Sequence, residues 1–152
     1  MANCRTATAL IEPLAVAWHV VEQSAVKAGD NVLVMGAGPI GLAIIKCLKI
    51  RQPGQIIVAE VAPNRGRFSQ KFGATAVIDP REQDVVSKCK ELCDGQGPDI
   101  AIDCAGVTAS IKAACSAVRN RGTVVNVSIW EKEIPFDMNA LVFVEKRLLT
   151  GR

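Results

Sequence analysis

Short runs of apolar residues alternate with amphipathic stretches along most of the chain. The apolar runs are rich in Val and Ile, which is typical of strands that are buried on both faces. Apolar positions in the intervening stretches recur at helical spacing. Predicted strands cover residues 32–35, 56–60, 76–78, 99–103 and 123–129. Strands that alternate with helices predict right-handed βαβ units, and therefore a parallel sheet.

Each helix-like stretch carries its own start or stop signal. Residues 40–51 are apolar almost all round, so we expect this helix to be buried. The next helix begins at Pro63, which suits a first turn, and ends at Gly73. Two further helices are predicted over residues 85–93 and 111–118. The whole pattern predicts an α/β fold, a doubly wound parallel sheet of about six strands with helices on both faces.

The two ends of the chain have a different pattern. Residues 1–31 contain one helical stripe and do not resemble the start of a domain, so we expect a connecting segment and helix that belong to another domain. The stretch IWEKEIPFDMN alternates apolar and polar residues, which favours a half-exposed strand, with Pro135 tolerable only at a sheet edge. EKRLLTG predicts one more short strand, after which the sequence stops as if cut.

Composition narrows the class of protein. Hydrophobic residues make up 49% of the 152 residues and aromatic residues only 4%, which suits an aliphatic core between sheet and helices. The net charge of +3 is spread along the chain without a basic run, so no nucleic-acid surface is indicated. No apolar stretch reaches the length of a membrane span and no signal peptide is visible. We therefore expect a soluble, cytoplasmic protein.

The cysteines do not form a disulfide pattern. Most of them fall within predicted helices or strands, which favours small buried hydrophobic residues that stay reduced. Cys89 and Cys93 could reach one metal ion from successive helical turns, but they continue an apolar stripe and are therefore expected in the core. The six cysteines are Cys4, Cys47, Cys89, Cys93, Cys104 and Cys115.

A glycine motif joins the first predicted strand to the first predicted helix. Gly36, Gly38 and Gly41 form G-x-G-x-x-G. In a dinucleotide-binding turn the first glycine permits the tight bend, the second lets a diphosphate approach, and the third lets helix and strand pack closely. The helix N-terminus would then face the phosphates with its N–H groups and positive dipole end. The alternative is an ordinary glycine-rich turn without a ligand.

An acidic residue follows the second predicted strand at the spacing of a ribose-binding carboxylate. Glu60 lies 19 residues beyond Gly41, where dinucleotide-binding domains place the acid that accepts hydrogen bonds from the ribose of NAD. An ordinary solvated glutamate is the alternative. Arg65 could stack on adenine, pair with Glu60, or bind the extra phosphate of NADP. We favour NAD because a carboxylate would repel that phosphate.

Several blocks occur together in the order and spacing of one family. EPLAVAWH, AGDNVLVMGAGPIGLAIIKCLK, FGATAVID, DIAIDCAG and RGTVVNVSIW make residues 8–151 resemble the zinc-containing medium-chain dehydrogenases, especially the butanediol and sorbitol (polyol) branch. The resemblance implies that residues 32–152 are an NAD-binding Rossmann domain. It also implies an enzyme that oxidises a secondary alcohol to a ketone by hydride transfer, with zinc held in a separate GroES-like catalytic domain. Family members pair into dimers or tetramers, here through an edge strand near 129–136.

The resemblance also assigns roles to individual residues. It places the phosphate loop first, then the adenosine ribose, the turn along the cofactor, the strand end beside the nicotinamide, and the last cofactor contacts. In that order, the residues are Gly36, Gly38, Pro39, Ile40 and Gly41; Glu60 and Arg65; Cys104, Ala105 and Gly106; Val127 and Ser128; and Thr150 and Gly151.

Metal binding by this chain is expected to be weak or absent. Glu12 matches a glutamate at or near the catalytic zinc of the branch, although a Glu-Pro pair before a helix is also a common N-terminal turn. A catalytic zinc needs about three protein ligands, and the family's cysteine and His-Glu pair have no counterpart here. His19, the only histidine, is expected to be a half-buried helix residue.

Two other classes of function remain open at this stage. A stand-alone nucleotide-binding or interaction module would share the fold without any hydride chemistry, because fold alone does not fix function. A zinc-free, quinone-reductase-like NADPH oxidoreductase is the other, opposed by Glu12 and Glu60. The chain by itself is expected to be catalytically inert, and the sequence does not rank butanediol, sorbitol or simpler alcohols as substrates.

Overall fold

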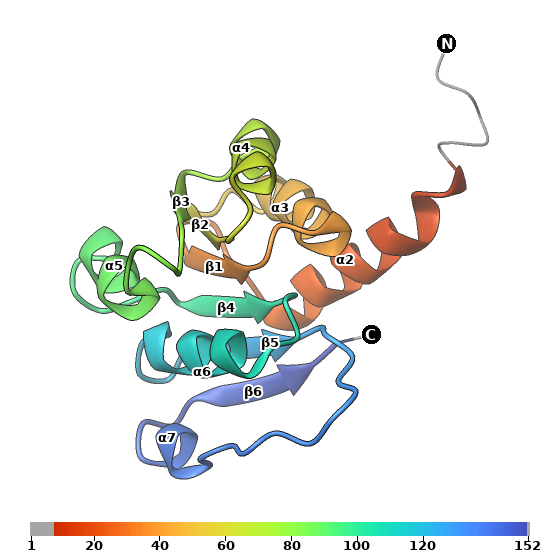
Figure 1. Ribbon diagram of the computed structural model, residues 1–152. Coiled ribbons are helices and arrows are strands. Elements are labelled where there is room, and N and C mark those ends of the chain that lie inside the picture. The colour runs from red at the N-terminus through yellow and green to blue at the C-terminus, as the bar shows by residue number, and fades with distance from the viewer. Residues whose placement is uncertain (1–7, 152) are drawn as a thin grey trace.

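The fold is a three-layer α/β arrangement, seen in a computed structural model that describes residues 8–151 (Figure 1). Strands lie in the middle layer and helices cover both faces. The elements in chain order are α2 (Ile11–Ser24), β1 (Asn31–Met35), α3 (Pro39–Ile50), β2 (Gln55–Ala59), α4 (Pro63–Phe72), β3 (Ala76–Ile78), α5 (Val85–Leu92), β4 (Ile100–Asp103), α6 (Thr108–Ala117), β5 (Thr123–Asn126), α7 (Asn139–Val142) and β6 (Arg147–Thr150).

The sheet confirms the predicted fold class. Its six strands are all parallel and follow the order β3-β2-β1-β4-β5-β6. The first four predicted strands are present within one residue of their expected bounds, whereas the strand predicted over residues 123–129 already ends at Asn126. The order reverses between β1 and β4, where Met35 pairs with Asp103 at the carboxyl end. A crevice outside the carboxyl ends at such a reversal is where open parallel sheets bind ligands.

The central strands are buried on both faces, as their continuous apolar runs predict. Val32, Val34 and Ile102 pack toward α2 and α3, whereas Leu33 and Ala101 pack toward α5 and α6. All five side chains have no exposed surface. Fully burying one Val, Leu or Ile side chain stabilises a fold by roughly 1.5–3 kcal/mol, so these two apolar layers hold the strands together.

Helix α3 is less buried than its sequence suggests. Ile44, Ile45 and Leu48 are buried against the sheet and α2, as expected. Lys46 and Lys49 are exposed on the opposite side, and the ammonium group of Lys46 lies 5.1 Å from the centre of the Phe72 ring on α4. The prediction of burial all round is therefore wrong, because the two lysines form a solvated face.

The predicted edge strand near residues 129–136 does not form. This segment has no regular secondary structure and runs as a long loop between β5 and α7 (Figure 1). Trp130, Ile134 and Phe136 pack against the core around α5 and α6, while Glu131 and Glu133 are exposed. The alternation of apolar and polar residues thus comes from a loop anchored to the core by some of its side chains, without a neighbouring strand to pair with.

The cysteines within the described residues are free, and most are buried as predicted. Cys89 has no exposed surface and Cys93 is 3% exposed, on the inner side of α5. Burial raises the pKa of both thiols, to about 12 for Cys89 and about 11 for Cys93. Cys4 lies outside the described residues. Among helices in the described part of the chain, none is long and apolar enough to cross a membrane.

Candidate cofactor-binding site

The turn between β1 and α3 brings its backbone close to the neighbouring turn after β4. Gly36 has a φ of +92°, a conformation that residues with a side chain rarely adopt. Its N–H donates to the carbonyl oxygen of Ala59 at the end of β2, at 2.8 Å. A Cβ added to Gly36 would lie 3.3 Å from the Cβ of Ala105 in the turn after β4. The two turns are therefore packed side by side at the point where the strand order reverses.

The other two glycines of the motif have different surroundings. A Cβ on Gly41 would collide with the carbonyl oxygen of Gly36, so this position must stay bare for the helix to fold back onto the turn. A Cβ on Gly38 would meet no protein atom within 4 Å. Packing within the protein therefore does not require a glycine at position 38. The missing side chain leaves open space in front of the turn.

The N-terminus of α3 fits an anionic group. Gly38 is the N-cap residue, Pro39 is the first helical residue, and no side chain caps this end of the helix. Unpaired N–H groups and the positive end of the helix dipole make such an end a binding site for phosphate. The uncapped helix and the open space at Gly38 together form a cradle that a diphosphate could occupy without moving a side chain.

Glu60 is buried at the edge of this cradle and is not the solvated glutamate of the alternative interpretation. Its side chain is only 3% exposed. The N–H of Ala37 in the glycine turn donates to Oε2 at 2.8 Å, and the N–H of Ala62 donates to Oε1 at 2.8 Å. Each carboxylate oxygen has about two lone pairs, so Oε2, which bonds only to Ala37 among the described residues, can still accept a hydrogen bond from a ligand. Glu60 also ties the end of β2 to the turn after β1.

Arg65 pairs with Glu60, which is one of its three predicted roles. A guanidinium nitrogen of Arg65 lies 3.1 Å from Oε1 of Glu60. The arginine side chain is 52% exposed, on the first turns of α4, so this end of the pair faces solvent. Its exposed guanidinium group therefore lies at the edge of the cradle, held by the pair with Glu60.

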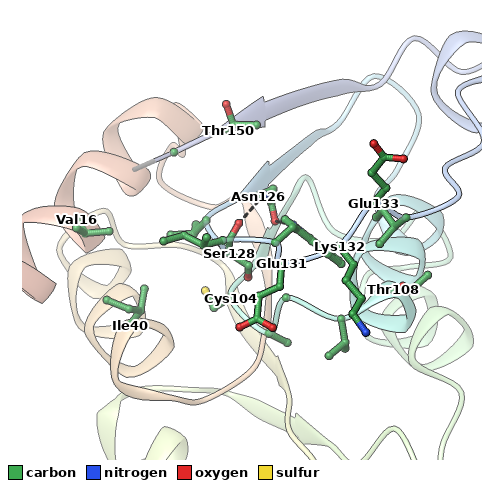
Figure 2. A pocket seen from close by; sticks show the side chains of 18 of the residues that line it. Val16, Ile40, Cys104, Thr108, Asn126, Ser128, Glu131, Lys132, Glu133 and Thr150 are labelled. Carbon is green, nitrogen blue, oxygen red and sulfur yellow. Dashed lines mark hydrogen bonds between the residues drawn. The ribbon is translucent and has the colours of Figure 1, made fainter.

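A cavity of about 1110 Å³ lies beside the cradle, somewhat larger than the roughly 300–1,000 Å³ of ordinary small-molecule sites. Figure 2 shows Val16 and Ile40 on its helical side, Thr150 at the end of β6, and Ser128 and Cys104 between them. The predicted site residues that line it are Ile40, Cys104, Ala105, Gly106, Val127, Ser128, Thr150 and Gly151, together with Glu12.

The remaining predicted site residues lie outside that cavity, on the turn after β1 and beyond the end of β2. They are Gly36, Gly38, Pro39, Gly41, Glu60 and Arg65. The predicted site is thus divided between an open cradle and a deeper cavity. Ile40 in the first turn of α3 belongs to both parts.

The turn after β4 is organised by a buried acid that the sequence does not single out. Asp103 has no exposed surface, and its Oδ1 accepts the N–H of Ala105 at 3.2 Å. Its Oδ2 has no hydrogen-bond partner within the described residues. Burial raises the pKa of Asp103, an effect larger than the lowering by the neighbouring Ser110 hydroxyl and the N–H groups of Ala105 and Gly106.

Two exposed aliphatic residues on the same edge of the sheet are also absent from the site predicted from the sequence. Val61 follows β2 and is 43% exposed, and Val107 follows β4 and is 53% exposed. With β1 between β2 and β4, these turns start roughly 10 Å apart. A single exposed valine cannot be recognised in a sequence, because the exposure depends on which strand ends the fold brings together.

Potential metal ligands are scattered over the described residues. Among residues 8–151, no three or more His, Cys, Asp or Glu side chains are grouped so that they could hold a metal ion. Glu12 is exposed at the start of α2. It lines the cavity, and no other acidic residue of α2 does so. His19 is exposed on the same helix and not half-buried, because it lies on the outer face next to Trp18. The described residues therefore do not fit a zinc site.

Comparison with known proteins identifies the family. Residues 39–151 match the family model described as zinc-binding dehydrogenase. The chain belongs to the zinc-binding dehydrogenase family. It corresponds to the nucleotide-binding domain of that family, which confirms the resemblance described above.

Individual relatives agree with this placement. The chain is 38% identical over 138 residues to (R,R)-butanediol dehydrogenase of Bacillus subtilis (strain 168), covering 91% of this chain and 40% of that protein. It is 34% identical over 131 residues to sorbitol dehydrogenase of the same organism, covering 86% of this chain and 37% of that protein. The chain thus spans about 40% of the length of the relatives it matches.

Solved structures have the same fold. The crystal structure of 2R,3R-butanediol dehydrogenase from Bacillus subtilis superposes with a TM-score of 0.88 at 37% identity, covering 93% of this chain and 41% of that chain. A protein from Sinorhizobium meliloti 1021, solved bound to NADP, superposes with a TM-score of 0.85 at 29% identity, covering 91% of this chain and 42% of that chain.

Proposed function

We propose that this chain is the NAD-binding part of a dehydrogenase that oxidises a secondary alcohol, diol or polyol to a ketone. The observation that carries the proposal is the uncapped N-terminus of α3 with the buried carboxylate of Glu60 beside it. An anion-binding helix end and a hydrogen-bond acceptor for ribose are the two features that a dinucleotide with free ribose hydroxyls requires. The butanediol and sorbitol dehydrogenases among its relatives support the substrate class.

The cradle would hold the adenosine half of the cofactor. The diphosphate would lie over Gly38 at the end of α3, where a Cβ would otherwise project. The ribose hydroxyls would donate to the remaining lone pairs of Glu60. A flat adenine ring with contacts of about 3.5–4.0 Å on each face would fit between Val61 and Val107.

The cavity would hold the nicotinamide half. Val127, Ser128, Thr150 and Gly151 line its wall at the ends of β5 and β6. Bound NAD would supply the acceptor for the hydride. The chain's own contribution is to fix the ring against these strand ends and to exclude water on that side. Cys104 stays a neutral thiol in this wall, because burial raises its pKa.

We expect the rest of the activity to depend on residues other than those described. Zinc ligands would come from another part of the enzyme, because the described residues offer no cluster of three. The chain alone is therefore expected to bind cofactor without turning over an alcohol. Pairing of subunits through residues 129–136 stays a prediction, and sedimentation at high concentration tests it, since a monomer at every concentration would contradict the pairing.

The choice between NAD and NADP is tested by changing Glu60 to Ala. This change removes the anchor of Ala37, so it should weaken both nucleotides to a similar extent. It also removes the charge that repels a 2′-phosphate and releases Arg65 to pair with that phosphate. The preference for NAD over NADP should therefore fall by about tenfold, as expected for a contact of about 1.4 kcal/mol.

Calorimetric titration of both nucleotides measures the ratio. Glu91→Ala, at an exposed position in the last turn of α5, serves as the matched control and should leave the ratio unchanged. An equal loss of NAD and NADP affinity in Glu60→Ala would show that Glu60 acts only as an anchor of the turn. Failure of the unmodified chain to bind either nucleotide would contradict the proposed function itself.

A further inference from the structure

The bend that follows β5 is closed by one side chain, that of Asn126. Its Nδ2 donates to the carbonyl oxygen of Ser128 at 3.1 Å, and its Oδ1 accepts the indole N–H of Trp130 at 3.2 Å. A carbonyl can only accept and an indole N–H can only donate, so the partners fix the orientation of the amide. One side chain therefore ties together residues 126, 128 and 130.

The same bend is attached to the strands on both sides. The carbonyl oxygen of Asn126 accepts the N–H of Gly151 at 2.9 Å, at the end of β6. The hydroxyl of Ser128 donates to the carbonyl oxygen of Asp103 at 3.3 Å, at the end of β4. The Asn126–Ser128 bond is drawn in Figure 2, where both residues lie in the wall between Cys104 and Thr150.

These hydrogen bonds give a fixed shape to the start of a long loop. Residues 127–138 have no regular secondary structure, so no ladder holds them. With Ser128 and Trp130 tied to Asn126, the residue between them, Ile129, is forced outward and is 90% exposed. Trp130 instead folds back against the core around α5 and α6 and lines the cavity. The wall is therefore held in place by side-chain hydrogen bonds at Asn126.

We propose that Asn126 is a positioning residue for the nicotinamide end of the cofactor, acting through Ser128 and Trp130. This inference rests on the proposed function, that the chain binds a dinucleotide. Asn126 does not act on the reacting atoms. It fixes the carbonyl of Ser128 and the plane of the Trp130 ring, so that the wall presents one surface to the ring of the cofactor.

Two variants separate the two hydrogen bonds. Asn126→Asp keeps an acceptor for the indole N–H but has no donor for the carbonyl of Ser128, and it sets two oxygens against each other. Trp130→Phe keeps an aromatic ring but removes the N–H that reaches Asn126. Trp18→Phe is the matched control, because Trp18 is the only other tryptophan and lies on α2, stacked with Arg51.

Comparing the affinities for NADH and ADP-ribose gives the contribution of the nicotinamide ring to binding, because ADP-ribose lacks that ring. Calorimetry on the chain and its variants gives the ratio of the two. We expect each variant to keep its ADP-ribose affinity and to lose about three- to tenfold in NADH affinity, the effect of one neutral hydrogen bond. Trp18→Phe should change neither, and its single remaining tryptophan, Trp130, allows energy transfer to bound NADH to be followed.

The results distinguish this inference from the proposed function. Equal losses for NADH and ADP-ribose, or no loss for NADH, would overturn the positioning role while leaving nucleotide binding intact. Equal affinity of the unmodified chain for both ligands would also overturn it, because the ring would then gain nothing from the wall. If the unmodified chain bound neither ligand, both proposals would fall. Melting curves show whether each variant folds. If Asn126→Asp does not fold, the affinities of Trp130→Phe alone decide between the outcomes.

Discussion

The turns after β1 and after β4 begin alike and end differently. Both follow neighbouring parallel strands, with Met35 paired to Asp103 in the last position. Both contain a glycine with positive φ, +92° at Gly36 and +65° at Gly106, and both lead into a helix on the carboxyl edge of the sheet. The helix after β1 starts without a side-chain cap.

The helix after β4 has no side-chain cap at its N-cap residue Val107 either, but Ser110 in its first turn bonds back to that residue. The hydroxyl of Ser110 donates to the carbonyl of Val107 at 2.8 Å and accepts its N–H at 3.4 Å. Asp103 supplies a buried carboxyl group to the N–H of Ala105 in the same turn. Because this carboxyl group lies beside Ala105, Gly106 and Ser110, we infer that it disfavours an anionic ligand here, and we call this second helix end closed.

The comparison shows that a glycine-containing turn before a helix does not by itself make an anion site. What decides the matter is whether a side chain of the protein occupies the helix end. At β1 the last strand residue is the apolar Met35, whose side chain can donate no hydrogen bond, and the acid that bonds to this turn is Glu60, directly after β2. The helix end after β1 is thus open to an anionic ligand, whereas the end after β4 has a buried carboxyl group beside it.

The largest effect is expected from Gly41→Ala in the open turn. The new Cβ would collide with the carbonyl oxygen of Gly36, and backbone cannot move aside as a flexible side chain can. Overpacking of this kind costs about 3 kcal/mol in free energy of unfolding, and nucleotide binding should be lost with the shape of the turn. Chemical denaturation measures the stability loss, and a variant as stable as the unmodified chain would show that the contact is not tight.

Gly38→Ala is the matched change, with an effect on binding alone. Its Cβ would meet no protein atom within 4 Å, and its backbone conformation suits any residue. The free energy of unfolding should therefore change by less than about 1 kcal/mol, the difference between these residues at an N-cap. Affinity for NAD should fall by about tenfold or more, corresponding to about 1.4 kcal/mol, because the methyl group occupies the space of the diphosphate.

A pair of denaturation and titration experiments on the two glycine variants therefore separates packing from ligand space. If Gly38→Ala bound NAD as tightly as the unmodified chain, the diphosphate would have to lie elsewhere. That result would remove the distinction between the open and the closed helix end.

The shape of the open turn after β1 could be predicted from the sequence. The buried acid in the closed turn after β4 could not. Gly36, Gly38 and Gly41 have a spacing that follows from the geometry of a strand, a bend and a helix, all of which are local. Glu60 could be predicted as well, because its distance along the chain reflects the length of one βαβ unit. The role of Asp103 depends on Ala105, Gly106 and Ser110 folding around it, and its burial is invisible in the sequence.

The loop after β5 is a second feature whose structure could not be predicted from the sequence pattern. Apolar and polar residues alternate over 129–136 as they would in a half-exposed strand, and the half-exposure is real. The strand is absent because nothing in the described part of the chain pairs with this segment, while Trp130, Ile134 and Phe136 anchor it to the core. A hydrophobic pattern records which side chains are buried, but not whether the backbone has a partner.

The smallest effect, and the sharpest test of the closed turn, is the pH dependence of stability in Asp103→Asn. Burial raises the pKa of Asp103 in the folded protein above the ordinary value of 3.8. Below that pH the carboxyl group is protonated in both states. As the pH rises, the unfolded chain releases its proton first, so the group's contribution to stability falls until the folded-state pKa has been passed.

Asn cannot titrate, and its side-chain oxygen can still accept the N–H of Ala105. The free energy of unfolding of the unmodified chain, relative to that of Asp103→Asn, should therefore be highest near pH 4 and should decline toward neutral pH. Denaturation of both proteins across this range measures the difference, in which all other titrating groups cancel. Parallel profiles would mean that burial does not raise the pKa of Asp103 in the folded protein, and would contradict the description of this carboxyl group as buried without a full set of partners.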